Sequence, residues 1–569
     1  MEVASEPTKI VGKSNMSNSL TVTAPVTTCE SASGEFTLPV NCIRRRHILS
    51  VIIVLVVVGT AFLPTLRAVY ELDDDHYLLW LSSRARIHEQ LPERGSVLEV
   101  LRSEMFSRGR IEPIATLLFQ FHSRWLVQNP RLHRICMLAV VLVTGWMLFL
   151  AGSRLTGSDF GGLLFSIWLM ICPAAQNVWP HIVRSETAGM LLISGILFSV
   201  TSAANNRRLL SFMGLFLFFP LCFEKENFFL MAPAFAYLAW AFQRAAAISP
   251  DRSVFANPFG FLGIGFLAGV SIYVGVKSAG TGSHGAQSLQ VSFSQALQVL
   301  LGAGGILRTL LANSFWCLPS LVGFAVWIKR RDRVSDRTRD LLVFSGLVLV
   351  PQVAIYMTRS SFEGRYAFPM LLGTVLPNTL AALYLWRSCP AWLPRTATAF
   401  AFVLFLARCW QIQLLENTNF TTETLAIKQV VEVAVSNIPS HGNAIVVAGP
   451  KSEHASAILT MIGYYGRPDC NVYLYQPNGT DGYADYGFQG LREIHDLMGK
   501  TVNCVVWLPG MENMLLPEDL TADLTDSTIQ YEKLYLSLRH LGLTRIPHKL
   551  RYAVHSSVVH RSTSKTVVK

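Results

Sequence analysis

The sequence predicts a polytopic α-helical membrane protein of about eleven transmembrane helices, followed by a C-terminal soluble α/β domain. Mean hydropathy is +0.37, and 51% of the 569 residues are hydrophobic while only 15% are charged. Many of the basic residues behind the net charge of +11 fall in short loops between apolar segments, which is the positive-inside pattern. The positive net charge is therefore accounted for by cytoplasmic loops of a membrane protein, and no nucleic-acid partner is expected.

The N-terminal region indicates where the chain starts relative to the membrane. Residues 1–43 are rich in Ser, Thr, Val and Ala without a helical or strand period, which predicts a disordered cytoplasmic tail. The tail is too polar for a cleavable signal peptide. Arg44–Arg46 precede the first apolar segment, Ile48–Leu66, which at about 1.5 Å per residue is long enough to cross a bilayer. The first span therefore begins in the cytoplasm and ends outside.

An acidic stretch follows this span at once. Glu71, Asp73, Asp74 and Asp75 place four carboxylates in five positions. Their mutual repulsion should leave some of them protonated near neutral pH. The structural interpretation is a solvated loop that stops the helix. The functional interpretation is a set of acidic catalytic residues, and it gains weight because later spans also bring charged groups to this side.

The external loop, residues 67–131, is amphipathic rather than uniformly apolar. Residues 77–128 carry too many charges for a transmembrane helix. Pro113–Val127 within them is best interpreted as an interfacial helix lying along the bilayer. The alternative is a short span, and the topology depends on this choice.

The remaining apolar segments then alternate across the membrane, with basic loops inside. Lys329 to Arg333 form the strongest cytoplasmic marker. The predicted spans after the first are Leu132–Gly152, Phe160–Asn177, Glu186–Ala203, Leu209–Phe223, Phe228–Phe242, Phe255–Val276, Leu310–Ile328, Leu341–Met357, Tyr366–Trp386 and Thr396–Leu415. The transmembrane domain is accordingly residues 44–415.

Residues 416–547 have the composition of a soluble domain on the external side. Strands alternate with helices, which predicts a small parallel sheet. There is no GxGxxG motif, so nucleotide binding is not supported. The predicted strands are Asn443–Gly449, Asn471–Tyr475 and Val502–Leu508, and the predicted helices are Glu453–Tyr465 and Gly490–Met498. Residues 548–569 are predicted to form a basic tail.

Two further features of this domain leave alternatives open. Cys470 and Cys504 lie near predicted strand ends in an oxidising compartment, and a disulfide and two free thiols are equally compatible with that. Asn419-Phe-Thr and Asn478-Gly-Thr are glycosylation sequons, which matter only if the organism glycosylates such sites.

Charged residues gather at the external ends of several spans. Any one of them could simply extend to the interface. Together, acids and bases converging on one side favour a site for a phosphorylated, membrane-embedded substrate, because Arg and Lys suit phosphate oxygens and a carboxylate can accept a hydroxyl proton. The groups are Arg184 with Glu186, then Glu224, Lys225 and Glu226, and finally Arg359, Glu363 and Arg365.

The order of several short motifs carries a family resemblance. The acidic stretch is followed by IEPIATLL, PRLHRICML and GSRLTGSDFGGLLFSIWLMICP, then by Glu186, a Lys between spans and GRYAFPM. In this order they resemble the GT-C membrane glycosyltransferases, and within them the protein O-mannosyltransferase and aminoarabinose-transferase-like branch. The resemblance covers Ile48 to Trp386.

The resemblance implies transfer of a hexosyl or pentosyl group from a polyprenyl-phosphate-linked donor to a lipid, glycan or protein acceptor on the external face, with inversion. Asp74-Asp75, or in the other register Asp73-Asp74, occupies the catalytic acidic-pair position, and Glu112-Pro113 replaces a Lys/His-Pro-Pro motif. The residues expected in substrate binding are Arg184, Glu186, Lys225, Arg365, Tyr366, Glu112 and His181.

The implied reaction is a direct displacement, in which a carboxylate takes the acceptor proton and cations stabilise the departing lipid phosphate. No cofactor is expected, and a divalent metal, which some branches use, is not favoured. The alternatives are a lipid-linked glycan ligase or polymerase and, third, a transporter or flippase, for which internal repeats are missing. The expected location is the plasma (inner) membrane with the C-terminal domain periplasmic or extracellular, or the ER membrane in a eukaryote.

Overall fold

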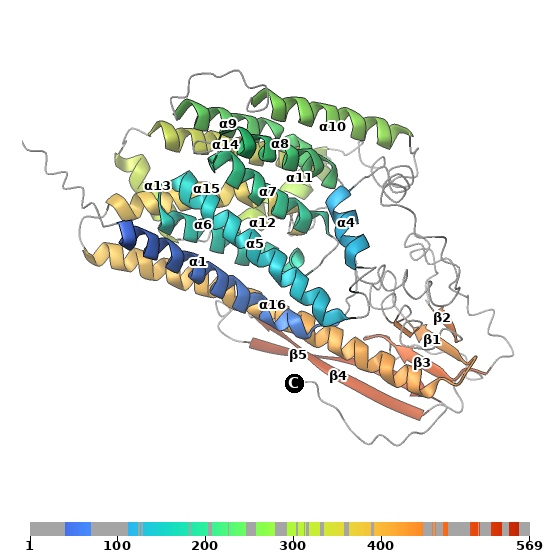
Figure 1. Cartoon of the computed structure of the whole chain (residues 1–569). Helices are drawn as coiled ribbons and strands as arrows, with labels where there is room; N and C mark the ends of the chain where they lie inside the picture. Colours follow the sequence, from blue (N-terminus) through green and yellow to red (C-terminus); the bar gives the residue numbers. More distant parts are fainter. Residues whose placement is uncertain are drawn as a thin grey trace, which may run out of the picture. The chain divides into compact units, whose positions relative to one another are not determined.

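Figure 1 shows the computed structural model of the chain. Up to residue 447 it describes residues 40–69, 112–122, 126, 129–180, 184–202, 207–225, 227–245, 258–278, 293–302, 305–311, 313, 318–330, 335–357, 364–388 and 392–447. Beyond residue 447 it describes residues 458, 461–462, 470–475, 501–509, 511, 525–536 and 545–556.

Helices account for most of the described residues before the C-terminal sheet (Figure 1). In chain order the elements are α1 (Val40–Phe62), η1 (Leu63–Arg67), α4 (Pro113–Phe121), α5 (Pro130–Thr156), α6 (Asp159–Ile171), η3 (Pro173–Asn177), α7 (Ser185–Ser202), α8 (Arg207–Glu224), η4 (Phe228–Met231), α9 (Ala232–Ala245), α10 (Pro258–Ser278), α11 (Phe293–Leu301), α12 (Ile306–Leu310), α13 (Leu318–Arg330), α14 (Asp336–Met357), η7 (Gly364–Ala367), α15 (Phe368–Ser388) and α16 (Trp392–Asn437).

Each apolar segment predicted as a span contains a helix, but the helices differ in length. Six helical stretches within the described residues are long and apolar enough to cross a membrane: His47–Arg67, Pro130–Thr156, Ser185–Ser202, Asp336–Met357, Phe368–Ser388 and Arg395–Asn437. The other helices, such as the 13-residue α6 and the 14-residue α9, are apolar but shorter or less hydrophobic. Membrane crossing by these helices stays a prediction.

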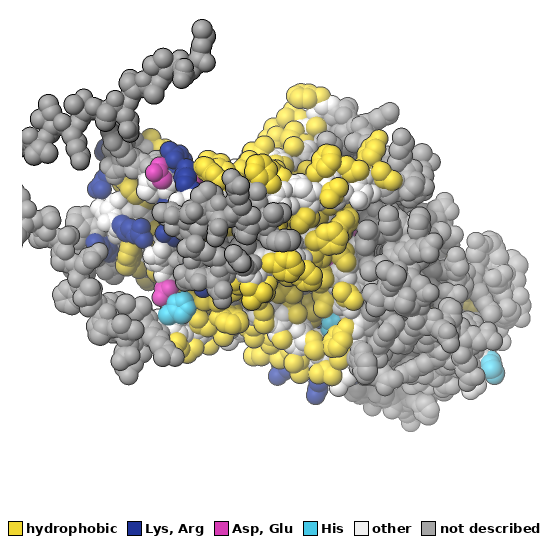
Figure 2. All heavy atoms as spheres, turned by 45° about the horizontal axis from the view of Figure 1, so that its top comes forward, with side chains coloured by type: hydrophobic (Ala, Val, Ile, Leu, Met, Phe, Trp, Pro, Cys, Tyr) yellow, Lys and Arg dark blue, Asp and Glu magenta, His cyan; other side chains and the backbone are white. Residues whose placement is uncertain are grey.

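Large apolar side chains remain exposed along several helices. Phe216 of α8 is 66% exposed and Phe266 of α10 is 72% exposed, and α16 exposes Phe400 and Val403. Figure 2 shows such side chains covering much of one face, with Lys and Arg gathered mainly at one end. An apolar surface of this extent is unfavourable in water but suited to lipid, where helices satisfy their own backbone hydrogen bonds. The helices therefore form a membrane-embedded domain.

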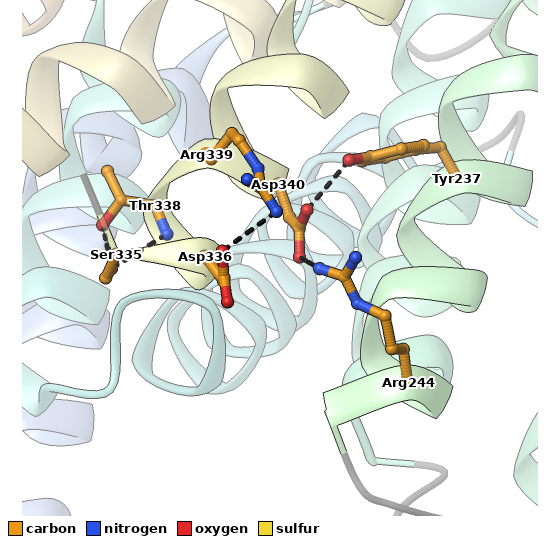
Figure 3. A network of polar contacts seen from close by, with 7 residues as sticks. All are labelled: Tyr237, Arg244, Ser335, Asp336, Thr338, Arg339 and Asp340. Carbon is orange, nitrogen blue, oxygen red and sulfur yellow. Dashed lines mark hydrogen bonds and ion pairs between the residues drawn. The ribbon is translucent and has the colours of Figure 1, made fainter. Parts of the chain in front are cut away.

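Contacts between helix ends show which ends share a side. Arg154, near the end of α5, donates a hydrogen bond to Ser202 at the end of α7. Arg337, at the start of α14, donates to a carbonyl oxygen at the end of α5 at 3.1 Å. Arg244, at the end of α9, pairs with Asp340 of α14 at 2.6 Å (Figure 3). We call this side the basic end, and the alternation predicted from basic loops groups these same helix ends together.

The last helix is longer than the sequence suggests. The predicted span ends at Leu415, yet α16 continues unbroken to Asn437. The polar residues that interrupt its hydrophobicity bind the end of the first span instead: Asn417 donates to the carbonyl of Ala61 at 2.7 Å, and Thr421 donates to that of Pro64 at 3.0 Å. These bonds tie α16 to the end of α1 and to η1.

A five-stranded sheet of order β2-β1-β3-β5-β4 packs on the distal part of α16 (Figure 1). The predicted strands are confirmed as β1 (Asn443–Val447), β2 (Asn471–Tyr475) and β3 (Cys504–Trp507), and β1 pairs in parallel with both of the others. The helices expected between them lie largely outside the described residues, so the α/β architecture as a whole stays a prediction.

The other two strands were not predicted. β4 (Thr525–Leu536) and β5 (Arg545–Ser556) pair along their whole length as an antiparallel ladder. The strand β5 thus extends past residue 548, where the sequence suggests that a basic tail begins. Its basic residues share the strand with alternating Leu550, Tyr552 and Val554, and Val554 is fully buried. Because charged residues interrupt the alternation of apolar and polar side chains, the sequence of this strand looks like that of a basic tail.

The sheet also bears on the cysteines and on one sequon. Cys470 and Cys504 are not joined by a disulfide. They flank β1 on opposite sides, which separates them by about two strand spacings of 4.8 Å, farther than a disulfide spans. Asn419 lies inside α16 and is only 6% exposed, so the first sequon is not open to modification in the folded chain. Asn478 lies outside the described residues.

Candidate functional site

A buried ion pair lies at the other end of the helices from the basic end. We call the end with the ion pair the site end. Glu186 is in the first turn of α7, and Lys225 follows the last residue of α8. The Lys225 ammonium donates to the Glu186 carboxylate, and the two side chains are 6% and 3% exposed. Burial of two charges is costly unless they are paired, so the contact fixes the start of α7 against the end of α8.

An aromatic ring completes this cluster. The Lys225 Nζ atom lies 4.0 Å from the centroid of the Tyr366 ring, a cation–π geometry. Tyr366 belongs to η7, within the GRYAFPM motif, and stacks on the buried Tyr356 of α14 at 5.3 Å with the two rings 11° apart. Three segments that are distant in sequence therefore meet at Lys225. We call Glu186, Lys225 and Tyr366 the site cluster.

The turn that carries Lys225 is held on both sides. Asn227 and Gln352 of α14, both buried, exchange two hydrogen bonds: Asn227 Nδ2 donates to Gln352 Oε1 at 2.5 Å, and Gln352 Nε2 donates to the Asn227 carbonyl at 2.7 Å. Gly189 of α7 permits the Phe228 ring to pack close by, because a Cβ atom there would lie 2.4 Å from that ring. The backbone around Lys225 is therefore rigidly placed.

Glu224, next to Lys225, has a structural role that the sequence did not indicate. Its carboxylate accepts hydrogen bonds from the backbone N–H groups of Ile114 and Ala115, the second at 3.1 Å. These N–H groups belong to the first turn of α4, where a carboxylate satisfies unpaired donors and complements the helix dipole. Glu112, expected to bind substrate, contributes its backbone: its N–H donates to the Phe223 carbonyl at 3.2 Å, and its φ is +39°.

Arg134 joins the two chain segments that lead to the candidate acidic residues. It comes from the PRLHRICML motif of α5 and is buried. One guanidinium nitrogen donates to the Val69 carbonyl and another to the Pro180 carbonyl, both at 2.7 Å. Val69 leads to Asp73–Asp75, and Pro180 leads to Glu186. Sequence reasoning missed this residue, although a buried arginine in an apolar helix is expensive enough to signal a role.

Val69 also contacts α16 and the C-terminal sheet. The N–H group of Val69 donates to Thr424 Oγ1 of α16 at 3.3 Å, and the Val69 side chain packs in the core formed by α16 and the sheet. The Arg134 guanidinium also lies 5.1 Å from the Phe420 ring centroid of α16. Val69, the last described residue before the acidic stretch, is therefore held jointly by α5 and α16.

A histidine pair lies next to Arg134. The Nδ1 atoms of His122 and His133 are 2.7 Å apart, and both side chains are buried. Burial, followed by the charge of Arg134, lowers the pKa of His122 to about 4. His122 is therefore neutral at physiological pH, which makes it a packing and hydrogen-bonding group there rather than a cation.

The structure places only part of the predicted site. Glu186, Lys225 and Tyr366 are brought together, and Glu112 lies beside them through its backbone. Arg184 is half-buried, and its carbonyl accepts from the Thr187 N–H at 3.0 Å at the start of α7. The residues Asp73, Asp74, Asp75 and His181 lie outside the described residues, as does the side chain of Arg365. Within the described part of the chain, no three His, Cys, Asp or Glu side chains are grouped as metal ligands would be.

The apolar helices and the buried cluster define an integral membrane protein with a charged site at one end of its helices. No protein-family model matches the sequence, and no curated protein is similar to it. Among solved structures, ArnT from Cupriavidus metallidurans in the apo state is similar with a TM-score of 0.44 and 11% identity, covering 91% of this chain and 98% of ArnT.

A second solved structure, the arabinofuranosyltransferase AftD from Mycobacteria, is similar with a TM-score of 0.41 and 14% identity. The match covers 91% of this chain but 40% of AftD, so this chain spans less than half the length of that protein. TM-scores below 0.5 do not establish a shared fold, and neither similarity constrains the function of this chain.

Proposed function

We propose that this chain is a GT-C-type membrane glycosyltransferase that transfers a sugar from a polyprenyl-phosphate-linked donor to an acceptor at the site end. The observation that carries the proposal is the site cluster: a buried Lys225, paired with Glu186 and packed on Tyr366, at the end of the helices where the acidic stretch begins. The order of motifs from the acidic stretch to GRYAFPM supports the same assignment.

The donor phosphate is the group that this chemistry suits. A lipid phosphate lies at the level of helix ends, and the site cluster lies at such a level. An ammonium has three donors, so Lys225 can hold Glu186 and still donate to a phosphate oxygen. Arg365, adjacent to Tyr366 in sequence, is the second cation of the proposed phosphate site, and its planar fork suits two phosphate oxygens.

One carboxylate of Asp73–Asp75 acts as the general base in this proposal. It takes the proton of the acceptor hydroxyl as the acceptor oxygen attacks the anomeric carbon. The bond from that carbon to the phosphate oxygen breaks, and the polyprenyl phosphate leaves with the electron pair, stabilised by Lys225 and Arg365. Arg134 holds Val69, which precedes the acidic stretch in sequence, and Pro180, which precedes Glu186.

Binding of bare polyprenyl phosphate tests the proposal without knowledge of the sugar, because every donor of this class shares that group. The full chain in lipid nanodiscs should bind it, and Arg365→Gln should weaken binding by roughly 10- to 150-fold, the loss of a charge-assisted hydrogen bond of about 1.5–3 kcal/mol. Lys225→Gln should act in the same direction, and Arg365→Lys should recover only part of the affinity.

Arg330→Gln is the matched control, since it removes an equal charge at the basic end. It should leave the affinity for polyprenyl phosphate unchanged. Native affinity in both Lys225→Gln and Arg365→Gln would remove the phosphate site from the proposal. Failure of the native chain to bind polyprenyl phosphate at all would refute the lipid-phosphate donor itself.

A further inference from the structure

A second charged feature lies far from the site cluster. At the basic end, a cavity of about 410 Å³ opens between the ends of α5, α13 and α15 and the start of α14. Its charged lining comes from Arg337 and Arg387, and Trp327 and Tyr384 are its aromatic residues. The hydroxyl-bearing lining residues are Thr156, Ser335 and Thr338. Gly157 and leucines from α5, α14 and α15 complete the described wall, so the cavity has a basic polar part and an apolar part.

Arg337 and Arg387 make the described lining of this cavity basic. No Asp or Glu is among its described lining residues. Arg337 donates from Nε and Nη2 to carbonyl oxygens at the end of α5, which stabilises that helix end but leaves the charge in place. Arg387 makes no hydrogen bond or ion pair with the part of the chain that the structure describes. The two guanidinium groups are close enough to repel each other, which an anion between them would relieve.

The neighbouring cavity shows the contrast. It has a volume of about 500 Å³ and also includes Arg337, but Asp336 and Asp340 line it. There Arg244 pairs with Asp340 at 2.6 Å, and the Tyr237 hydroxyl donates to the same carboxylate at 2.9 Å (Figure 3). Arg337 thus lines both cavities, and among the described lining residues only the second cavity contains carboxylates.

The cavity with two arginines also has the amphipathic lining that a lipid requires. The Trp327 and Tyr384 rings lie 5.9 Å apart, and such rings favour the level of lipid headgroups. The Ser335 and Thr338 hydroxyls, 2.9 Å apart, add donors for phosphate oxygens at the first turn of the 22-residue α14. Basic pockets between transmembrane helices commonly hold anionic headgroups.

We propose that this cavity binds the phosphate of an anionic membrane lipid, with Arg337 and Arg387 as the phosphate ligands and an acyl chain along the leucines. A zwitterionic lipid is disfavoured, because its cation would find no carboxylate among the described lining residues. The proposal does not depend on the glycosyltransferase assignment, since the site is at the opposite end of the helices from Lys225.

The test titrates the purified full chain in detergent with short-chain phosphatidylglycerol and measures bound lipid by native mass spectrometry. Arg387→Gln is the decisive variant, because Arg387 is exposed and makes no hydrogen bond or ion pair with the described residues. It should raise the dissociation constant at least about tenfold, and Arg387→Lys should recover part of the loss. Arg330→Gln removes the same charge from the same end without lining the cavity and should change the constant less than about twofold.

Three results would overturn the proposal. Equal weakening by Arg387→Gln and Arg330→Gln would mean that general surface charge attracts the lipid. Equal affinity for phosphatidylethanolamine would remove the requirement for a net anion. Binding of glycerol 3-phosphate as tight as that of the lipid would show a site for a free phosphate ester. Because none of these measurements involves a sugar, failure here leaves the proposed transferase activity to its own test.

Discussion

Replacement of Lys225 by Met should destabilise the protein strongly, because it leaves the Glu186 carboxylate buried without its cation. Both side chains are less than one-tenth exposed, and breaking a buried pair on one side costs about 3–5 kcal/mol. The double variant Lys225→Met/Glu186→Leu removes both charges and should return the unfolding free energy to the native value or above. A double-mutant cycle should therefore show a large coupling energy between Lys225 and Glu186.

Unfolding of purified variants by a graded rise in SDS, followed by circular dichroism, measures these free energies, and polyprenyl phosphate binding is measured on the same samples. The double variant should be folded but bind polyprenyl phosphate at least about tenfold more weakly. Arg244→Met is the matched control: its ion pair with Asp340 is at the basic end, and its side chain is 42% exposed, so the stability loss should be smaller and binding unchanged. Native affinity in the folded double variant would show that the Glu186–Lys225 pair serves only the fold.

Asp74→Asn should reduce the rate of sugar transfer from a lipid-linked donor by about 10²–10⁴-fold, with expression unchanged. Near-native transfer in both Asp74→Asn and Asp75→Asn would exclude the acidic stretch as the general base. Burial lowers the pKa of His122 to about 4, so the folded state resists protonation of this imidazole. The free energy of unfolding should therefore fall by up to about 3 kcal/mol as the pH drops from 6.5 towards 4. His122→Gln should flatten that fall. Cysteines introduced at Arg330 and Thr418 in a background without reactive cysteines should be labelled from opposite sides of the membrane, and labelling from one side would contradict the topology.

The helices of the membrane domain could be predicted from the sequence because each rests on local hydropathy. The basic residues at their ends also predicted which ends lie together, and the contacts of Arg154, Arg244 and Arg337 group those ends in the same way. Short helices such as α6 are recognisable as apolar segments, but hydropathy alone does not determine whether a 13-residue helix followed by Pro173 crosses a membrane.

The length of α16 could not be predicted, because the residues that end its apolar pattern have partners more than 350 positions away. Asn417 and Thr421 look like the start of a soluble domain until they are seen to bind the carbonyls of Ala61 and Pro64. β5 was missed for a related reason: its strand character depends on pairing with β4, and charged residues mask its alternation.

The residues of the candidate site also differ in whether the sequence could indicate them. The sequence indicated Glu186 and Lys225 by their places at span ends, and Tyr366 through the family resemblance of the GRYAFPM motif. The structure shows that Lys225 contacts both of the others. The sequence did not identify Arg134 or the capping role of Glu224, because both act on backbone groups, which leave no pattern in the side chains of their partners. The catalytic role of Asp73–Asp75 stays a prediction.

Mass analysis of lipid-linked sugars and envelope glycans in cells with and without this chain tests the central claim most directly. Cells that lack the chain should accumulate one polyprenyl-phosphate-linked sugar and lose one glycan modification that contains the same sugar. The native chain should reverse both changes, and Asp74→Asn at equal expression should reverse neither. Unchanged lipid-linked sugars and glycans in cells that lack the chain would contradict its assignment as a transferase of lipid-linked sugars.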